Sequence, residues 1–334
     1  MSGYRTDVAI STGVGYSIVE NASLEGRNTF RVAARASMLV DVRDAAALPE
    51  LFAFDGLRTQ PLLVLGEGSN ILFAGDWPGV VLSMATRGID TLENNADDVL
   101  VRVAAGENWN DFVYWCLAHE ISGLENLVLI PGTVGGAPIQ NIGAYGVEVG
   151  DSIERVHVWD RDARLVSVLE HAECRFAYRD SVFKQQPARY LVVAVEFRLP
   201  RTARLHLGYA GIVEEIAALG AGEPTIARVA EAVSRLRLRK LPNPALIGNA
   251  GSFFKNPLID SALAQAIGAS NPTCPTWPAG SRTKLSAAWL IDACGMKGYR
   301  DGDAGVSDLH ALVLVNHGRA SGADLLRVAR KVAS

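Results

Sequence analysis

The chain is poor in the residues that build disulfide scaffolds and zinc sites. Its 334 residues include only four cysteines, which are dispersed and form no C-x-x-C pair. The six histidines show neither H-x-H nor H-E-x-x-H spacing. Both patterns argue against a metal site. Isolated cysteines in a chain of this length are typical of reduced thiols in a cytoplasmic protein.

An excess of positive charge and a long apolar segment are also missing. The formal net charge is -4, so the overall charge does not attract nucleic acid. The longest apolar runs, at residues 191–195 and 311–315, are far too short to cross a bilayer. Arg5 and Asp7 interrupt the N-terminal segment, which does not resemble a signal peptide. We therefore expect a cytoplasmic protein without a nucleic-acid or membrane partner, and we expect a monomer.

Hydrophobic residues make up 49% of the chain, enough for two or three cores at ordinary domain sizes. Short β-rich runs and helical patterns both occur, which indicates an α+β fold. Strands are predicted at residues 61–65, 80–82, 99–103, 153–159, 190–199 and 311–316. Helices are predicted at residues 108–120, 224–240, 261–267 and 286–294, with a final helix from Ser321. Two prolines in Leu241-Pro242-Asn243-Pro244 end the long helix and mark a domain boundary.

Two glycine-rich loops are candidates for holding a phosphate. The first, Gly66-Glu67-Gly68-Ser69-Asn70, follows the apolar run 61–65, which is predicted to be a buried strand. Glycine lets the backbone approach a ligand closely and turn its N–H groups toward an anion. The loop matches neither a P-loop nor the full G-x-G-x-x-G fingerprint. An ordinary turn after a strand is an equally good interpretation of this loop alone.

The second loop covers residues 131–146 and follows another apolar run, 127–130, which we take as a second strand. It contains five glycines and two prolines, so a regular helix or strand is excluded. Long aperiodic segments in compact domains usually serve a ligand. The alternative is a solvated surface loop, which Ile130, Val134 and Ile139 make less attractive. Two such loops after two strands suit a pyrophosphate held from both sides.

Four motifs stand in the order found in one enzyme family. The strand–loop order resembles the flavin-binding domain of vanillyl-alcohol-oxidase-like enzymes. The detailed sequence resembles the type I UDP-N-acetylenolpyruvoylglucosamine reductases, also called UDP-N-acetylmuramate dehydrogenases, from about Asn28 to the end of the chain. The motifs are Gly66-Glu67-Gly68-Ser69-Asn70, Pro138-Ile139-Gln140-Asn141-Ile142-Gly143-Ala144-Tyr145-Gly146, Tyr178-Arg179-Asp180-Ser181 and Gly248-Asn249-Ala250-Gly251-Ser252-Phe253-Phe254-Lys255-Asn256-Pro257. The last of these, hereafter the decapeptide, is the most specific.

The resemblance implies three domains, two of them forming a two-lobed FAD-binding module. Lobe 1 would cover residues 1–85, lobe 2 residues 86–240, and a C-terminal α/β substrate-binding domain residues 241–334. FAD would be non-covalent, because neither loop holds a histidine or cysteine, and NADPH would be the co-substrate. The flavin would contact Gly66, Gly68, Ser69, Asn70, Pro131, Gly132, Gly135, Gly136, Asn141, Gly143, Ala144 and Tyr145.

The resemblance also implies the reaction, which is reduction of UDP-N-acetyl-3-O-(1-carboxyvinyl)glucosamine (UDP-N-acetyl-enolpyruvylglucosamine) to UDP-N-acetylmuramate for the cell wall. A hydride and a proton must reach the two alkene carbons, and a cation must stabilise the charge that develops on the carboxylate. Ser252 is the expected acid and Arg179 the expected cation. Without the motifs, a capping serine and a surface pair between Arg179 and Asp180 would be the preferred interpretations. The substrate would also contact Tyr209, Lys240, Asn256 and Lys297.

The family has one further catalytic residue, a glutamate in a short strand after the last helix. This sequence carries no glutamate beyond Ser321. We therefore expect FAD binding but poor turnover from a chain that ends at Ser334. Two other hypotheses remain: a flavin oxidase of the wider superfamily, and a homologue that binds FAD or a UDP-sugar without catalysis.

Overall fold

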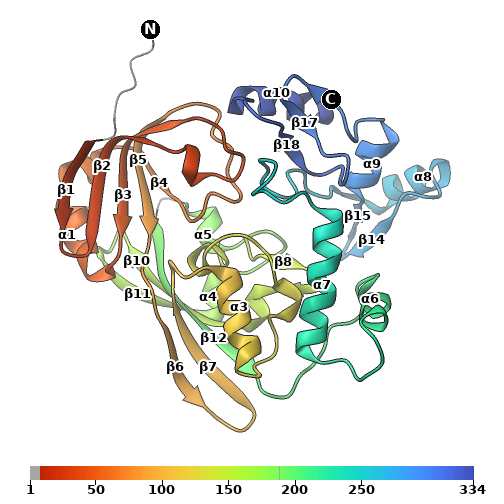
Figure 1. Ribbon diagram of the computed structural model, residues 1–334, viewed down its shortest axis with the longest axis horizontal. Coiled ribbons are helices and arrows are strands. Elements are labelled where there is room, and N and C mark those ends of the chain that lie inside the picture. Colours follow the sequence, from red (N-terminus) through yellow and green to blue (C-terminus); the bar gives the residue numbers. More distant parts are fainter. Residues whose placement is uncertain (1–7, 188) are drawn as a thin grey trace. The chain divides into compact units, whose positions relative to one another are not determined.

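The structure is a computed structural model that describes residues 8–187 and 189–334, and the chain divides into two compact units (Figure 1). The first unit comprises the chain up to Ser23, Arg35–Gly68 and Trp77–Arg237. The second comprises Leu24–Ala34, Ser69–Asp76 and Leu238–Ser334. Two short N-terminal segments thus belong with the C-terminal part of the chain. The three-domain boundaries drawn from the resemblance remain a prediction.

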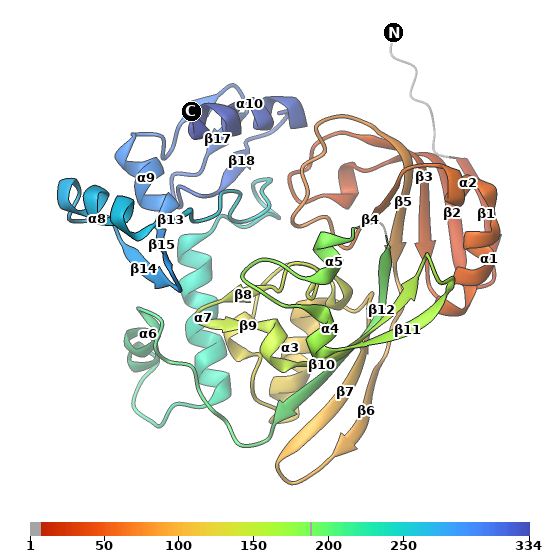
Figure 2. The ribbon, with the colours of Figure 1, turned by 180° about the vertical axis from the view of Figure 1, so that it is seen from behind.

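The first unit holds a mixed five-stranded sheet in the order β1-β2-β3-β5-β4 (Figure 2). Strands β3 and β4 both pair with β5 in parallel, and the other pairs are antiparallel. The prediction of a buried strand at 61–65 is only partly right, because β4 is a half-buried edge strand with one neighbour. The strands are β1 (Val8–Gly13), β2 (Tyr16–Ser23), β3 (Arg35–Val42), β4 (Leu62–Val64) and β5 (Trp77–Met84).

A second, fully antiparallel sheet follows in the order β11-β10-β12-β7-β6. Helix α3 (Trp109–Ala118) packs its aromatic side chains on this sheet, with the Phe112 and Phe197 ring centroids 4.9 Å apart. The predicted cap at Asn108 is confirmed, since its side chain accepts from two backbone N–H groups of the first turn. The strands are β6 (Ile89–Asn94), β7 (Asp98–Ala104), β10 (Ile153–Asp160), β11 (Leu165–Glu170) and β12 (Tyr190–Pro200).

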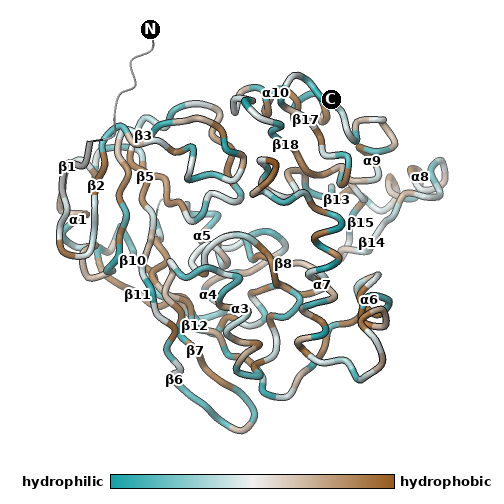
Figure 3. The backbone as a smooth tube through the Cα atoms, in the orientation of Figure 1, coloured by the Kyte–Doolittle hydropathy of each residue, from teal (hydrophilic) through white to brown (hydrophobic). Residues whose placement is uncertain are grey.

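The two sheets of the first unit share one hydrophobic core. Phe52 stacks on Trp159 of the second sheet at 5.9 Å. Helix α7 (Ile226–Lys240) confirms the long predicted helix, and hydrophobic and hydrophilic bands alternate along it (Figure 3). The remaining elements of this unit are short: α1 (Leu48–Ala53), α2 (Asp55–Thr59), α4 (His171–Cys174), α5 (Val182–Gln185), α6 (Ile212–Ala218), β8 (Gly143–Ala144) and β9 (Val147–Glu148).

Two small antiparallel sheets and three helices make up most of the second unit, with orders β13-β15-β14 and β16-β17-β18. The capping box predicted at Ser321 and Asp324 is confirmed at the start of α10 (Gly322–Ala333). The predicted strand 311–316 is shorter, because only β18 (Leu314–Asn316) forms a continuous ladder. The other elements are β13 (Leu258–Asp260), α8 (Ser261–Ser270), β14 (Thr276–Ala279), β15 (Arg282–Leu285), α9 (Ala287–Ala293), β16 (Arg300–Asp301) and β17 (Ala304–Val306).

Long-range contacts fasten the two N-terminal segments within the second unit. The backbone N–H of Asn249 donates to the Thr29 carbonyl at 3.0 Å, and the Asn316 side chain donates to the Phe30 carbonyl at 2.9 Å. Gly322 lies so close to Phe73 that an added Cβ would stand 1.7 Å from its carbonyl oxygen. These contacts explain why segments 24–34 and 69–76 belong to this unit.

The mixture of helices and sheets confirms the α+β class. Within the described chain, none of the helices has the length and apolar character that crossing a membrane requires. The strand expected at 127–130 is wrong. Residues 125–127 form a 3-10 helix, and the next three residues join no ladder.

Candidate functional site

The two glycine-rich loops are linked by one carboxylate in the first unit. Glu67 accepts from the backbone N–H of Gly132 at 3.0 Å and from the side chain of Asn108 at 2.6 Å. Because Asn108 also caps α3, the first loop, the second loop and the helix N-terminus form a single hydrogen-bonded group. The sequence motif contains Glu67, but sequence reasoning gave it no role.

Close backbone packing requires glycine at two positions of this group. A Cβ on Gly66 would stand 2.9 Å from the Thr133 hydroxyl, and one on Gly135 would stand 2.6 Å from Ala105 Cβ. The backbone N–H groups of Gly66 and Glu67 make no hydrogen bond within the described parts of the chain. Two successive free N–H groups at the end of a strand can donate to an anion such as a diphosphate.

Much of the second loop uses its own amides. The N–H of Gly135 donates to Ala105 and that of Gly136 donates to Thr133. The glycines of this loop therefore allow close packing, and these two amides are already satisfied. Ser69 and Asn70, expected beside the loops, belong to the second unit.

Asn141 and Arg179 are brought together at the other end of the second loop. The buried Asn141 side chain donates to Glu148 at 2.8 Å and accepts from the Gly150 N–H at 2.8 Å. The Arg179 guanidinium donates to the carbonyl oxygens of Asn141 and Gly143. Arg179 itself has a φ of 56°, a conformation that an arginine rarely adopts. The Arg179 side chain is thus held against the loop.

Two predicted ligand-contacting tyrosines meet in the first unit. The rings of Tyr145 and Tyr209 form an edge-to-face pair with centroids 4.8 Å apart. Burial raises the pKa of the Tyr145 hydroxyl, and the nearby Arg237 partly opposes this. Burial likewise lowers the pKa of Arg237, which Tyr145 raises. Arg237 is therefore a half-buried cation beside the tyrosine pair.

In the second unit, Ser252 lies on an exposed tight turn. Gly251 has a φ of 66°, as expected for the glycine before the serine, and its N–H donates to Asn249 at 3.0 Å. Backbone pairing with residues 312 and 313 fixes the turn, since the Phe253 N–H donates to the Leu312 carbonyl at 2.8 Å. The Ser252 hydroxyl has no hydrogen-bond partner in the described chain, so it can reach a ligand.

The remaining predicted substrate residues are also in this unit. Asn256 accepts from the first N–H of α9 at 3.0 Å, which leaves its amide NH₂ group as the donor for a ligand. Lys240 and Lys297 both lie near His310: burial lowers the pKa of His310, and the two lysine charges lower it further. His310 is therefore a neutral imidazole close to two lysine cations. Its Nδ1 accepts from the Leu312 N–H at 3.2 Å.

Sequence comparison with known proteins identifies the family of this chain. UDP-N-acetylenolpyruvoylglucosamine reductase of Xanthomonas oryzae pv. oryzae (strain PXO99A) is 53% identical over 325 residues, covering 97% of this chain and 93% of that protein. The chain belongs to the UDP-N-acetylenolpyruvoylglucosamine reductase family. The reductase of Xanthomonas axonopodis pv. citri (strain 306) is 54% identical over 321 residues, covering 96% of this chain and 92% of that protein.

Domain and structural comparisons agree with membership of this reductase family. Residues 36–169 match an FAD binding domain, and residues 243–334 match the C-terminal domain of UDP-N-acetylenolpyruvoylglucosamine reductase. The crystal structure of the reductase from Thermus caldophilus superposes with a TM-score of 0.67 at 28% identity, covering 93% of this chain and 92% of that one. The predicted resemblance is therefore confirmed.

Two residues near the reductase motifs, one a cation and one a neutral histidine, were given no functional role by sequence reasoning. Arg237 stands three residues before Lys240 on α7, so helical spacing could have drawn attention to it. His310 has no local motif, because only the pairing of residues 312 and 313 with the decapeptide brings it near the site. In the described part of the chain no group of histidine, cysteine and acidic side chains could hold a metal ion.

Proposed function

We propose that this chain is an FAD-dependent reductase that uses NADPH to convert UDP-N-acetyl-3-O-(1-carboxyvinyl)glucosamine to UDP-N-acetylmuramate, in the cytoplasm. The observation that carries the proposal is the exposed Ser252 hydroxyl, held on a fixed turn inside the decapeptide of a chain 53% identical to a named reductase. The free, dispersed cysteines fit a reducing compartment.

The glycine-rich loops fit the flavin diphosphate. The unbonded N–H groups of Gly66 and Glu67 would donate to its oxygens. The glycines at 66 and 135 let the backbone pack closely on Thr133 and Ala105, which keeps the loops in place. When bound, FAD supplies a hydride to the alkene carbon distal to the carboxylate, after reduction by NADPH. Tyr145, Asn141, Gly143 and Ala144 would also contact the flavin.

Ser252 and Arg179 would complete the reduction. The serine hydroxyl gives its proton to the carbon next to the carboxylate, and solvent returns a proton to the serine oxygen. Arg179 would pair with the carboxylate as its charge grows, and the carbonyls of Asn141 and Gly143 orient the guanidinium for that role.

The polar residues around the turn would hold the nucleotide sugar. Lys240 and Lys297 would pair with phosphate oxygens, and Asn256 would donate its free amide hydrogens. Tyr209 would close over the uridine end, supported by its contact with Tyr145.

Replacement of Ser252 by alanine separates the two half-reactions. We expect NADPH to bleach the bound flavin at the wild-type rate, while reduction of the enolpyruvyl sugar falls by more than 10³-fold, within the range attributed to general acid catalysis. Ser270→Ala, at an exposed serine on α8, is the matched control and should leave both steps unchanged. An unchanged overall rate in Ser252→Ala would remove the serine from the mechanism.

A further inference from the structure

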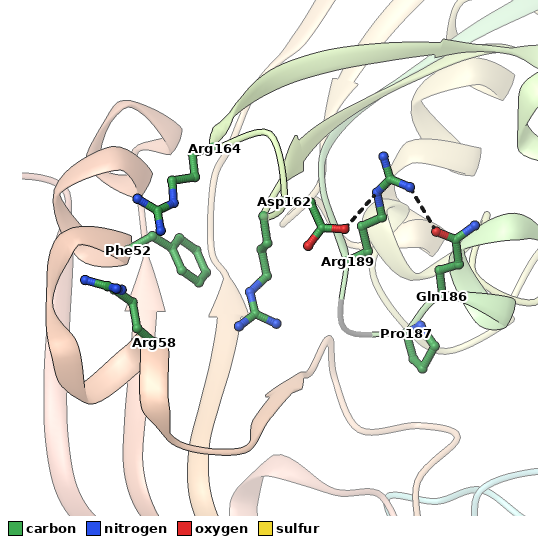
Figure 4. Close-up of a pocket in the computed structure, with 8 residues that line it drawn as sticks. Phe52, Arg58, Asp162, Arg164, Gln186, Pro187 and Arg189 are labelled. Carbon is green, nitrogen blue, oxygen red and sulfur yellow. Dashed lines mark hydrogen bonds and ion pairs between the residues drawn. The ribbon is translucent and has the colours of Figure 1, made fainter.

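A pocket in the first unit contains none of the residues given a role above. It has a volume of about 610 Å³, within the range of small-molecule sites. Figure 4 shows Phe52, Arg58 and Arg164 on one side of it, and Asp162, Gln186, Pro187 and Arg189 on the other. The lining residues are Phe52, Arg58, Arg161, Asp162, Arg164, Gln186, Pro187 and Arg189.

Positive charge is in excess in this pocket. Four arginines and one carboxylate line it, although the whole chain carries a net charge of -4. Two arginines are neutralised: Arg189 pairs with Asp160 at 2.9 Å, and Arg58 pairs with Asp55 at 3.3 Å. The side chain of Arg164 makes no ion pair or hydrogen bond within residues 8–187 and 189–334. At least one guanidinium is therefore available to a ligand.

Arg161 is held in place by aromatic side chains. Its guanidinium lies over the Phe52 ring, 5.5 Å from the centroid, and Phe52 in turn stacks on Trp159. Burial lowers the pKa of Arg161, and Asp162 only partly offsets the cost of its charge. A bound anion would stabilise this cation and be stabilised by it.

The turn that carries these arginines is preorganised. One carboxylate oxygen of Asp160 accepts from the N–H groups of Asp162 and Ala163, at 2.9 and 3.2 Å. The N–H of Arg164 donates to the Asp160 carbonyl at 2.7 Å, and Arg164 has a φ of 56°. Binding an anion would therefore require little ordering of the backbone.

We propose that this pocket binds a small anion carrying a chain of two or more phosphate groups. Guanidinium groups recognise phosphate oxygens by paired hydrogen bonds. Arg161 and Arg164 lie in one cavity, which favours a ligand with more than one negative charge. The volume exceeds what a single phosphate fills, which favours a polyphosphate or a nucleoside polyphosphate.

Calorimetric titration of the FAD-loaded full chain tests the proposal at about 0.15 M salt, where weak surface attraction is largely screened. The probes are inorganic tripolyphosphate and ATP, each added with UDP in excess to occupy a uridine site. We expect saturable binding of at least one probe, weakened tenfold or more in Arg164→Glu. Arg175→Glu is the matched control, because Arg175 is also an exposed arginine with positive φ, 50°.

Three outcomes would overturn the proposal. Neither probe binds, both variants lose affinity equally, or a glutamate-rich peptide binds more tightly than either phosphate compound. The last outcome would assign the pocket to an acidic protein partner. Comparison of ATP with tripolyphosphate separates a nucleotide from an inorganic ligand. The assay involves no turnover, so its failure is distinct from failure of the reductase proposal.

Discussion

Glu67 accepts a hydrogen bond from the backbone N–H of Gly132, at 3.0 Å, across 65 residues of sequence. The same carboxylate accepts from Asn108, so it holds two loops and a helix cap in one arrangement. A ligand cradled by these loops would depend on that arrangement even without touching the carboxylate.

Replacement of Glu67 by alanine should therefore weaken FAD binding. We expect a roughly tenfold higher Kd, equivalent to about 1.4 kcal/mol, because both hydrogen bonds to the carboxylate are lost. Glu67→Gln keeps an acceptor oxygen and should have a smaller effect. Quenching of flavin fluorescence on titration of the apoprotein measures the affinity. Glu223→Ala, at an exposed glutamate before α7, is the control, and equal losses in the two alanine variants would contradict the idea.

The neighbouring glycines Gly135 and Gly136 should respond differently to alanine. A Cβ on Gly135 would stand 2.6 Å from Ala105 Cβ and 3.1 Å from the Ala105 backbone, whereas one on Gly136 would meet nothing closer than 3.6 Å. We expect Gly135→Ala to lower the free energy of unfolding by about 1–3 kcal/mol, the cost of overpacking. Gly136→Ala should change it by less than about 0.5 kcal/mol. Urea denaturation of the apoproteins is the measurement, and similar values for the two variants would count against the packing argument.

Glu196 should stabilise the second sheet in a pH-dependent way. Its side chain is fully buried, with Arg102 and His157 each 2.7 Å away and Arg155 at 3.2 Å. Burial alone would raise the pKa of this carboxyl, but hydrogen bonds from Arg102 and His157 bring it below its usual value. The folded state therefore favours the carboxylate. The ionised carboxylate therefore adds to the free energy of unfolding. This contribution is complete above the unfolded-state pKa of about 4.3 and disappears as the pH falls through the lower folded-state pKa.

Glu196→Gln should accordingly lower the free energy of unfolding by about 1.5–3 kcal/mol at pH 7, the range for a hydrogen bond to a charged group, because Glu196 is fully buried but its arginine partners are partly exposed. The difference from wild type should shrink as the pH falls below about 4. Denaturant titrations between pH 7 and pH 3.5 measure both effects. Glu93→Gln is the control, because it removes the charge of a half-exposed partner of Arg198. It should lower the free energy of unfolding by less than about 1 kcal/mol. A pH-independent loss in Glu196→Gln would show that its charge is irrelevant.

Substitution of Gly322 tests how closely α10 packs on segment 69–76 within the second unit. An added methyl group would stand 1.7 Å from the Phe73 carbonyl oxygen, so the start of α10 or the segment must shift. We expect Gly322→Ala to destabilise the protein by at least about 2 kcal/mol, at the severe end of overpacking. Gly268→Ala, in α8 with no atom within 4 Å of its Cβ, should stabilise it by about 0.5–1 kcal/mol. Thermal unfolding compares the two, and a neutral Gly322→Ala would contradict the close packing.

Local signals made part of the fold predictable. The cap residues Asn108 and Ser321 start the helices that sequence reasoning expected, and the apolar stripe of α7 is buried as its spacing indicates. The apolar run at 127–130 misled because hydrophobicity without periodicity does not distinguish a strand from a buried irregular segment.

Features made by distant residues were not predictable. The hydrogen bond between Asn316 and Phe30 joins residues 286 apart, and neither has a local signature. The pocket around Arg161 and Arg164 is likewise lined by residues from segments that connect strands of both sheets. The motifs drew attention to Ser252 and Arg179, which the structure finds in ordered turns, but gave no indication of a role for His310 or Arg237.

Segments 24–34 and 69–76 have a consequence for synthesis of the chain on the ribosome. Phe30 emerges 286 residues before Asn316, the side chain that satisfies its carbonyl. At ordinary translation rates of about 5–20 residues per second this interval lasts roughly 15–60 s. The second unit therefore cannot be completed until Asn316 has been made, and its early segments lack these partners while the residues of the first unit are synthesised.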